Sequence, residues 1–331
     1  MNKHKVSILV PIYNVSEYIE RCAHSLFQQT FDDIEYVFVN DCTQDDSVEK
    51  LQKVIEQYPN RKSFVKIIHH EKNCGLATTR NTAIDNSTGQ YIQVVDSDDW
   101  IELDMIEKMY KTSIKKSADI VVCDVLLEQE NKTIMLPSLI SHTKEEHFFD
   151  MLAKKIPIVH WNKLIKRELY ELSDCRVPDG FDCGEDCYVI PRIFLMANKI
   201  VRVNETLYHY NKYNYSGYLS MMPIIVRTKF RYVLFQSIDD FLKKQKLYDR
   251  YIKKLEYIKV ADKLEMFIEP NSTYKMRKQF AFMFKEFEMN YFNSFRLGEK
   301  LMLFFTHYHF FLCAHIIQKL IVFKNRKIEY K

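Results

Sequence analysis

Residues 96–99, Asp-Ser-Asp-Asp, gather three carboxylates at the end of the apolar run 91–95, with no Lys or Arg beside them. We call these residues the acidic segment. Carboxylates this close repel one another unless a cation offsets their charge. Mg²⁺ and Mn²⁺ prefer oxygen ligands and take only one or two from the protein, leaving the others to phosphate and water. The segment therefore predicts a divalent-cation site for a diphosphate, against the alternatives of a solvated loop or a helix cap at Asp99.

Three other polar segments also follow apolar runs of strand length. They read PIYN after the first run, NDCTQDDS at the end of the second and HHEKNCGLATTRN after the third. Open α/β sheets bind their ligands at the carboxyl ends of their strands. The three segments and the acidic segment are therefore predicted to meet in one site.

The elements that would position these residues alternate along the first 125 residues. Each apolar run is short and uniformly apolar, which predicts a strand buried on both faces. Strands are expected at 6–10, 34–39, 64–68, 91–95 and 119–125, and helices at about 14–26, 46–57, 76–86 and 103–115. This order predicts an α/β fold with a mostly parallel sheet covered by helices on both faces.

Glycine-based phosphate sites are excluded by composition. The chain has only six Gly, and neither GxGxxG nor GxxxxGK[ST] occurs. These loops are the usual signs of a dinucleotide-dependent dehydrogenase or a P-loop NTPase. A diphosphate would instead be neutralised by a metal held on carboxylates.

The four segments, in this order, resemble those of the family 2 glycosyltransferases. The matching patterns are Pro-x-Tyr-Asn, Asn-Asp-x-Thr-x-Asp, Asn-x-Gly-x-x-x-x-Arg-Asn and Asp-Ser-Asp-Asp. The resemblance is close over residues 4–125 and looser to about residue 215. It implies the GT-A fold, with a Rossmann-like, mostly parallel sheet, and an inverting transfer from a sugar nucleotide. A C-terminal helical region follows.

The resemblance also implies roles for single residues. Asp41 would accept a hydrogen bond from uracil N3–H, although Asn40 and Cys42 depart from the usual Asp-Asp-Gly-Ser. Asp98 and Asp99 would contact the ribose and a Mn²⁺ or Mg²⁺ ion, with Asp96 supporting them. The expected nucleotide-sugar contacts are Pro11, Tyr13, Asp41, Asn73, Gly75, Arg80, Asp96, Asp98 and Lys163.

Three of these positions have alternatives. Tyr13 would stack on uracil or be an ordinary buried aromatic residue. Arg80 would pair with phosphate or with the acidic segment, or form a salt bridge on a helix surface. Lys163, next to Trp161, would reach phosphate or lie on the surface.

Inversion requires one general base facing the metal across the sugar. Gly184-Glu185-Asp186 resembles the family's late Glu-Asp motif. Asp186 is the predicted base and Glu185 the second candidate. The alternative is that both acids cap a helix over residues 188–195.

Residues 1–220 are predicted to form the catalytic domain, with a nucleotide-sugar half (1–125) and an acceptor half (126–220). Residues 221–331 are predicted to form a basic, aromatic helical region. They contain 22 Lys and Arg against 11 Asp and Glu, whereas the preceding part is acidic. Residues 297–331 would either touch a membrane peripherally or only pack within this region. Nucleic-acid binding is not expected, because no recognised motif occurs.

The sequence thus predicts a metal-dependent transfer of a hexose or N-acetylhexosamine from a UDP-sugar to a saccharide or lipid-linked saccharide. The product would be a cell-surface polysaccharide or lipopolysaccharide. With no signal peptide or spanning segment expected, the site of action would be the cytoplasm or the inner face of the cell membrane. The alternatives are a sugar-nucleotide nucleotidyltransferase and a non-catalytic sugar-nucleotide-binding protein.

Overall fold

The computed structural model describes residues 4–173, 175–178, 181, 184–212 and 223–329. The chain forms two compact units, Met1–Gly217 and Tyr218–Lys331. The predicted domain boundary at residue 220 lies outside the described residues.

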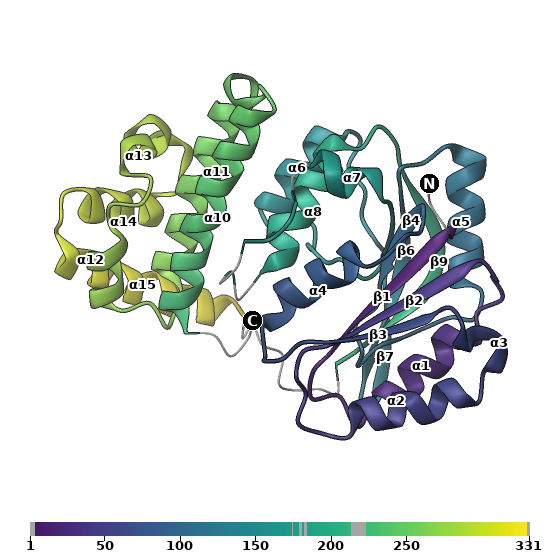
Figure 1. The fold of residues 1–331 in the computed structure, drawn as a ribbon. Coiled ribbons are helices and arrows are strands. Elements are labelled where there is room, and N and C mark those ends of the chain that lie inside the picture. Colours follow the sequence, from purple (N-terminus) through teal and green to yellow (C-terminus); the bar gives the residue numbers. More distant parts are fainter. Residues whose placement is uncertain (1–3, 174, 179–180, 182–183, 213–222, 330–331) are drawn as a thin grey trace. The chain divides into compact units, whose positions relative to one another are not determined.

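The first unit is built on one curled, mixed sheet (Figure 1). In the described residues its nine strands are β1 (Val6–Ile12), β2 (Ile34–Asn40), β3 (Val65–His69), β4 (Tyr91–Val94), β5 (Trp100–Ile101), β6 (Ile120–Gln129), β7 (Lys132–Leu136), β8 (Lys163–Lys166) and β9 (Ile200–Asn211). The strand order is β3-β2-β1-β4-β8-β6-β9-β5, and β7 pairs with β6. The strands from β3 to β4 are parallel, whereas β8 is antiparallel to both of its neighbours.

Helices cover both faces of this sheet. They are α1 (Ile19–Phe27), α2 (Ser47–Glu56), α3 (Pro59–Lys62), α4 (Gly75–Asp85), α5 (Met105–Lys116), α6 (Lys144–Leu152), α7 (Glu168–Leu172) and α8 (Glu185–Met196). Successive side chains of a strand point to opposite faces. In β1, Val6, Ile8 and Val10 therefore pack with α1 and α5, whereas Leu9 joins the core beneath α4 and α8.

The five predicted strands and four predicted helices are confirmed, with shifts of a few residues at their ends. The prediction that every strand is buried on both faces is wrong for β3. This strand is at the edge of the sheet, and its side chains are half-buried or exposed. Asp99 caps no helix at Ile101, because Trp100–Ile101 is strand β5 and the next helix begins at Met105.

The second unit is helical. Its described elements are α10 (Ile224–Lys244), α11 (Tyr248–Ile268), α12 (Tyr274–Phe280), α13 (Lys285–Tyr291), the 3₁₀ turn η1 (Phe292–Ser294), α14 (Leu297–His307) and α15 (Phe311–Glu329). Several of its basic side chains are buried and paired. Lys263 bonds Glu288 at 2.6 Å, and Lys259 bonds Asp239 at 2.6 Å. Within the described residues, no helix combines the length and apolar character needed to cross a membrane.

Candidate active site

The predicted polar segments meet at one edge of the sheet. β1 lies between β2 and β4 and runs parallel to both, with Ile12 opposite Asn40 and Leu9 opposite Val94. The chain therefore leaves three adjacent strands at the same edge, where Tyr13, Asp41 and Asp96 follow. This common edge is the arrangement that ligand sites of α/β sheets use.

The acidic segment alternates in exposure. Asp96 and Asp98 are half-buried, while Ser97 and Asp99 are buried. Strand β9 fixes this conformation from the far end of the sheet. The Tyr208 hydroxyl donates to Asp99 Oδ2 at 2.6 Å and accepts from the backbone N–H of Asp96 at 3.2 Å. The backbone N–H of Asn211 donates to Asp99 Oδ1 at 2.7 Å.

Asp99 is therefore placed as a support. Its side chain is buried, and both carboxylate oxygens already accept hydrogen bonds. Burial and the charges of Asp98 and Asp96 raise its pKa well above the ordinary value. The predicted metal contact of Asp99 stays a prediction, because a bound cation would itself favour the ionised carboxylate. The carboxylates of Asp96 and Asp98 are half-buried and therefore more accessible to an ion than that of Asp99.

Arg80 joins the acidic segment to the late Glu-Asp motif. From the second turn of α4, its Nη2 lies 2.7 Å from Asp96 Oδ1. Its Nη1 lies 2.9 Å from Asp186 Oδ1 and also bonds Glu185. Arg80 is 5% exposed, so this is a buried ionic cluster. Although burial lowers the pKa of Arg80, the three carboxylates raise it above its ordinary value. Of the predicted alternatives for Arg80, the structure contains the pairing with the acidic segment.

Glu185 and Asp186 form the first turn of α8, and Gly184 precedes them with φ 67°. This left-handed backbone favours glycine, so Gly184 allows the turn that aims both acids at Arg80. Burial raises the pKa of Glu185 to about 7, with Asp186 adding to the effect. Burial also raises the pKa of Asp186, but Arg80 and His160 outweigh it and hold the pKa below its ordinary value. Asp186 therefore remains ionised at neutral pH, whereas Glu185 is only partly ionised there.

His160 lies close to Asp186. Its Nδ1 lies 3.5 Å from Asp186 Oδ1, and its Nε2 lies 2.6 Å from the Tyr170 hydroxyl. His160 is 2% exposed, and burial lowers its pKa, which favours the neutral ring. The bond to Tyr170 holds one side of the ring, whereas Nδ1 lies within ion-pair distance of Asp186 but makes no hydrogen bond to it. His160 therefore lies behind Asp186 as a neutral ring.

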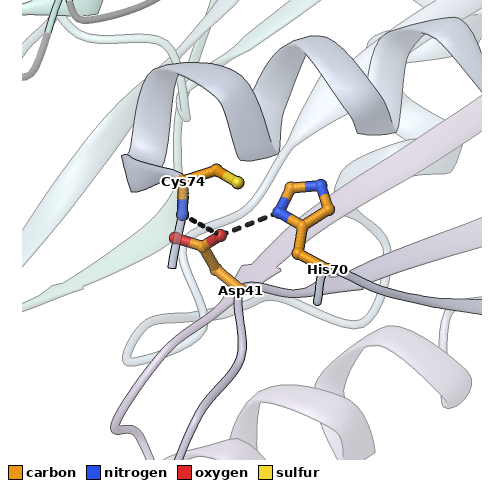
Figure 2. A group of neighbouring side chains, drawn as sticks. All are labelled: Asp41, His70 and Cys74. Carbon is orange, nitrogen blue, oxygen red and sulfur yellow. Dashed lines mark hydrogen bonds and ion pairs between the residues drawn. The ribbon is translucent and has the colours of Figure 1, made fainter. Parts of the chain in front are cut away.

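Figure 2 shows Asp41 with His70 and Cys74. Their potential ligand atoms lie within 4.8 Å of one another, close enough for all three to bind one metal ion. However, Asp41 Oδ1 already pairs with His70 Nδ1 at 2.7 Å and accepts from the N–H of Cys74 at 2.8 Å. Its Oδ2 accepts from the N–H of Gly75 at 2.9 Å. Asp41 thus satisfies the amino end of α4, where a negative charge is favoured.

The other predicted contacts are spread around this edge. Tyr13 is 46% exposed, so its ring is not an ordinary buried aromatic residue. Pro11 is buried within β1, and Asn73 is exposed and accepts from the N–H of Gly75. Lys163 is not a surface residue: it is 4% exposed, bonds Asn162 and lines an apolar cavity.

Four residues that support the site were not predicted to do so. Tyr208 and Asn211 come from β9, and His160 and Tyr170 flank β8. The period-2 spacing of Tyr208 and Tyr210 indicates one face of a strand, and both rings stack on Trp161. No local pattern pairs these residues with the acids.

A family model described as Glycosyl transferase family 2 matches residues 7–172. Glycosyltransferase GlyA of Streptococcus pneumoniae is 32% identical over 218 residues, which are 62% of this chain and 30% of that protein. Putative glycosyltransferase EpsH of Bacillus subtilis is 35% identical over 217 residues, 63% of this chain and 61% of that protein. The chain therefore spans less than two thirds of these relatives.

The fold is similar to that of S. aureus TarS 1-349, solved in complex with UDP-GlcNAc. The TM-score is 0.68 at 16% sequence identity, and the match covers 95% of this chain and 90% of that chain. At this identity the likeness shows the fold alone. The predicted GT-A class, with a C-terminal helical region, is confirmed.

The buried cluster around Arg80 gives the first prediction. Arg80→Met should lower the free energy of unfolding by about 3–5 kcal/mol at pH 7, because it leaves three close carboxylates without their cation. Part of this loss should be recovered at pH 5, where the carboxylates can take up protons. Urea unfolding at both pH values measures the effect.

Arg176→Met is the matched control. Arg176 pairs with Asp85 at 2.7 Å, but the two side chains are 39% and 57% exposed. Its removal should cost less than about 1 kcal/mol. Equal losses for the two variants would show that the cluster has no special role.

Proposed function

The chain belongs to glycosyl transferase family 2, and from this premise we propose that it transfers a hexose or N-acetylhexosamine from a UDP-sugar to a saccharide. The observation that carries the proposal is the meeting of Tyr13, Asp41, the acidic segment and Asp186 at one sheet edge. Arg80 ties the donor-side and base-side acids together. The solved complex of the similarly folded TarS with UDP-GlcNAc supports a UDP donor.

Each donor contact is proposed from the placement of its residue. Tyr13 offers an exposed ring on which uracil stacks. A carboxylate has about four acceptor positions, and Asp41 uses three of them. The remaining position, on Oδ2, would accept uracil N3–H. Asn73 and Gly75 lie next to Asp41 at the start of α4, where the N–H of Gly75 donates to both Asp41 and Asn73.

A divalent cation fits the acidic segment. The donor set consists of carboxylate oxygens, which suits Mn²⁺ or Mg²⁺, and Asp96 and Asp98 are both half-buried rather than enclosed. We therefore propose Asp98 as the main ligand, assisted by Asp96. When bound, the ion would neutralise the charge of the diphosphate leaving group.

Asp186 is the proposed general base of an inverting reaction. It remains ionised at neutral pH, and it pairs with Arg80 and lies beside His160. Its carboxylate would take the proton of the acceptor hydroxyl as that oxygen attacks the anomeric carbon. Glu185, with a pKa raised to about 7, is bonded to Arg80 and shapes the charge of the cluster.

The second prediction separates donor binding from turnover. Asp186→Asn should retain UDP binding within about threefold and lower the transfer rate by at least about 100-fold, the usual contribution of a general base. Asp98→Asn should instead weaken UDP binding in the presence of Mn²⁺ and lose the response to the metal.

The assay is a screen of UDP-sugars with Mn²⁺, Mg²⁺ or chelator, measuring UDP release and UDP affinity. Unchanged turnover in Asp186→Asn would overturn the base assignment, and Glu185→Gln would then be tested. Formation of UDP-sugar from UTP and a sugar phosphate would support the nucleotidyltransferase alternative. Tight UDP-sugar binding without any turnover would support the non-catalytic alternative.

The third prediction concerns the support of the acidic segment. Tyr208→Phe removes the hydroxyl that bridges Asp96 and Asp99, and should weaken UDP binding with Mn²⁺ by about five- to tenfold, the value of one buried hydrogen bond. Tyr210→Phe is the control, because Tyr210 also stacks on Trp161 but makes no bond to the acidic segment among the described residues. Calorimetric titration should separate the two variants; equal affinities would remove the bridging role.

We also propose peripheral contact of α15 with the cytoplasmic face of the cell membrane, where a lipid-linked saccharide of a cell-surface polymer would be glycosylated. The support is an apolar stripe at helical spacing. Leu312, Ile316, Leu320 and Phe323 are 68%, 54%, 59% and 60% exposed, and Lys319 lies exposed among them. Such a face suits an interface with anionic lipid. Residues 330–331 of the predicted contact segment lie outside the described residues.

The fourth prediction tests this contact. Replacing Leu312, Ile316 and Leu320 together by Ser should lower binding to phosphatidylglycerol vesicles at least tenfold, because each apolar side chain contributes about 1 kcal/mol or more to burial. The control replaces Leu103, Ile114 and Leu172, which are 48%, 52% and 55% exposed in the first unit. Vesicle sedimentation measures both; equal binding would contradict the proposal.

A further inference from the structure

An apolar cavity of about 300 Å³ lies in the first unit, beside the elements of the proposed active site. Side chains of β6, α6, α8 and β9 line it, among them Val125, His147, Phe194 and Tyr210. The indole of Trp161 forms another part of the wall. A volume of this size is at the lower end of small-molecule sites, which are mostly apolar with a few polar groups.

The polar group of this cavity is a buried lysine. Lys163 is 4% exposed, and its Nζ bonds Asn162 Oδ1 at 2.5 Å. Within the described residues, no carboxylate forms an ion pair with it. The Asn162 amide is itself fixed, because it donates to Ser138 Oγ at 2.8 Å and to the Cys123 carbonyl at 3.1 Å. The ammonium has three donors, so it retains capacity for a ligand.

The environment of Lys163 is costly for a cation. A charge without an ion pair in an apolar site is disfavoured, and burial lowers the pKa of Lys163 to about 8, although the charge of Asp186, which lies outside the cavity lining, partly opposes this. His147, which also lines the cavity, adds no charge at neutral pH, because burial lowers its pKa to about 4. The described lining contains Lys163 and the exposed Lys212 but neither Asp nor Glu. The cavity therefore offers Lys163 no anion from its own lining, and an anionic ligand would supply one.

The exposed part of the cavity lining carries apolar side chains beside Lys212. Leu136 and Leu139 belong to it and are 42% and 56% exposed. These exposed leucines continue the apolar lining outward and offer a surface that suits a nonpolar chain. The cavity thus combines a buried lysine with a mostly apolar lining.

We propose that this cavity binds an amphiphilic anion, a carboxylate or phosphate carried on an apolar chain, with its anionic group against Lys163 Nζ and its chain along Trp161 and Phe194. In this low-dielectric site an ion pair with the ligand would stabilise the charged form of Lys163, which burial disfavours. Each methylene of the ligand chain would add apolar contact with the lining. The inference does not depend on the proposed sugar transfer, since none of the acids proposed for that reaction lines the cavity.

The experiment uses Trp161 as the reporter. The chain has two Trp, so Trp100→Phe leaves Trp161 as the only indole. Titration with 8-bromooctanoate should quench its fluorescence, because bromine quenches an indole at contact. Competition with octanoate, octyl phosphate and octanol then ranks the ligands.

Octanoate or octyl phosphate should compete at least tenfold more strongly than octanol, a difference of about 1.4 kcal/mol. The tighter of the two anions identifies the head group. Lys163→Met should remove this preference while changing octanol affinity by less than about threefold, whereas Lys212→Met should preserve the preference.

Equal affinities for octanol and the anions, or no quenching below the micelle concentration, would overturn the proposal even if Lys163→Met does not fold. UDP release by the same protein is measured in parallel. Loss of the amphiphile site with normal UDP release would therefore be distinguished from failure of the proposed reaction.

Discussion

The buried guanidinium of Arg80 is the interaction on which the arrangement of the acids depends. Carboxylates from the end of β4 and from the first turn of α8 converge in a region from which water is largely excluded. Their mutual repulsion would separate these elements without a cation between them. The planar fork of arginine directs one nitrogen to each side, which the single ammonium of lysine cannot do. One side chain thus sets the spacing between Asp96 and Asp186.

The acids of this site differ in pKa because their surroundings differ. Asp186 faces both Arg80 and His160, and its pKa falls despite burial. Glu185, one residue earlier, bonds Arg80 but is more affected by burial and by Asp186, so its pKa rises to about 7. Asp99 is buried beside two other acids, and its pKa also rises. Adjacent carboxylates can therefore differ in charge at neutral pH, which is consistent with the separate residues proposed for the base and the metal ligand.

The sequence was sufficient for the parts of the site that depend on local order. β1, β2 and β4 are apolar runs followed by polar segments, and parallel strands bring such segments to one edge. It was not sufficient for the support of Asp99, which comes from β9. The bond between Asn211 and Asp99 spans 112 positions of the chain. Hydrophobic periodicity indicates that a strand exists, but not which strand it will join or whether the pairing is antiparallel, as it is for β8.

The number of charged residues in the helical unit is, in a similar way, only a limited guide to the charge on its surface. The excess of Lys and Arg beyond residue 221 suggests a basic surface, but Lys259, Lys263 and Arg277 are at most 1% exposed. Lys263 donates to Glu288 and to two backbone carbonyls, so its charge is used inside the unit. Other basic side chains, such as Lys243 and Lys253, are exposed, so the unit presents both positive charge and the apolar stripe of α15. An affinity for membranes would therefore combine apolar burial with an electrostatic contribution that salt weakens.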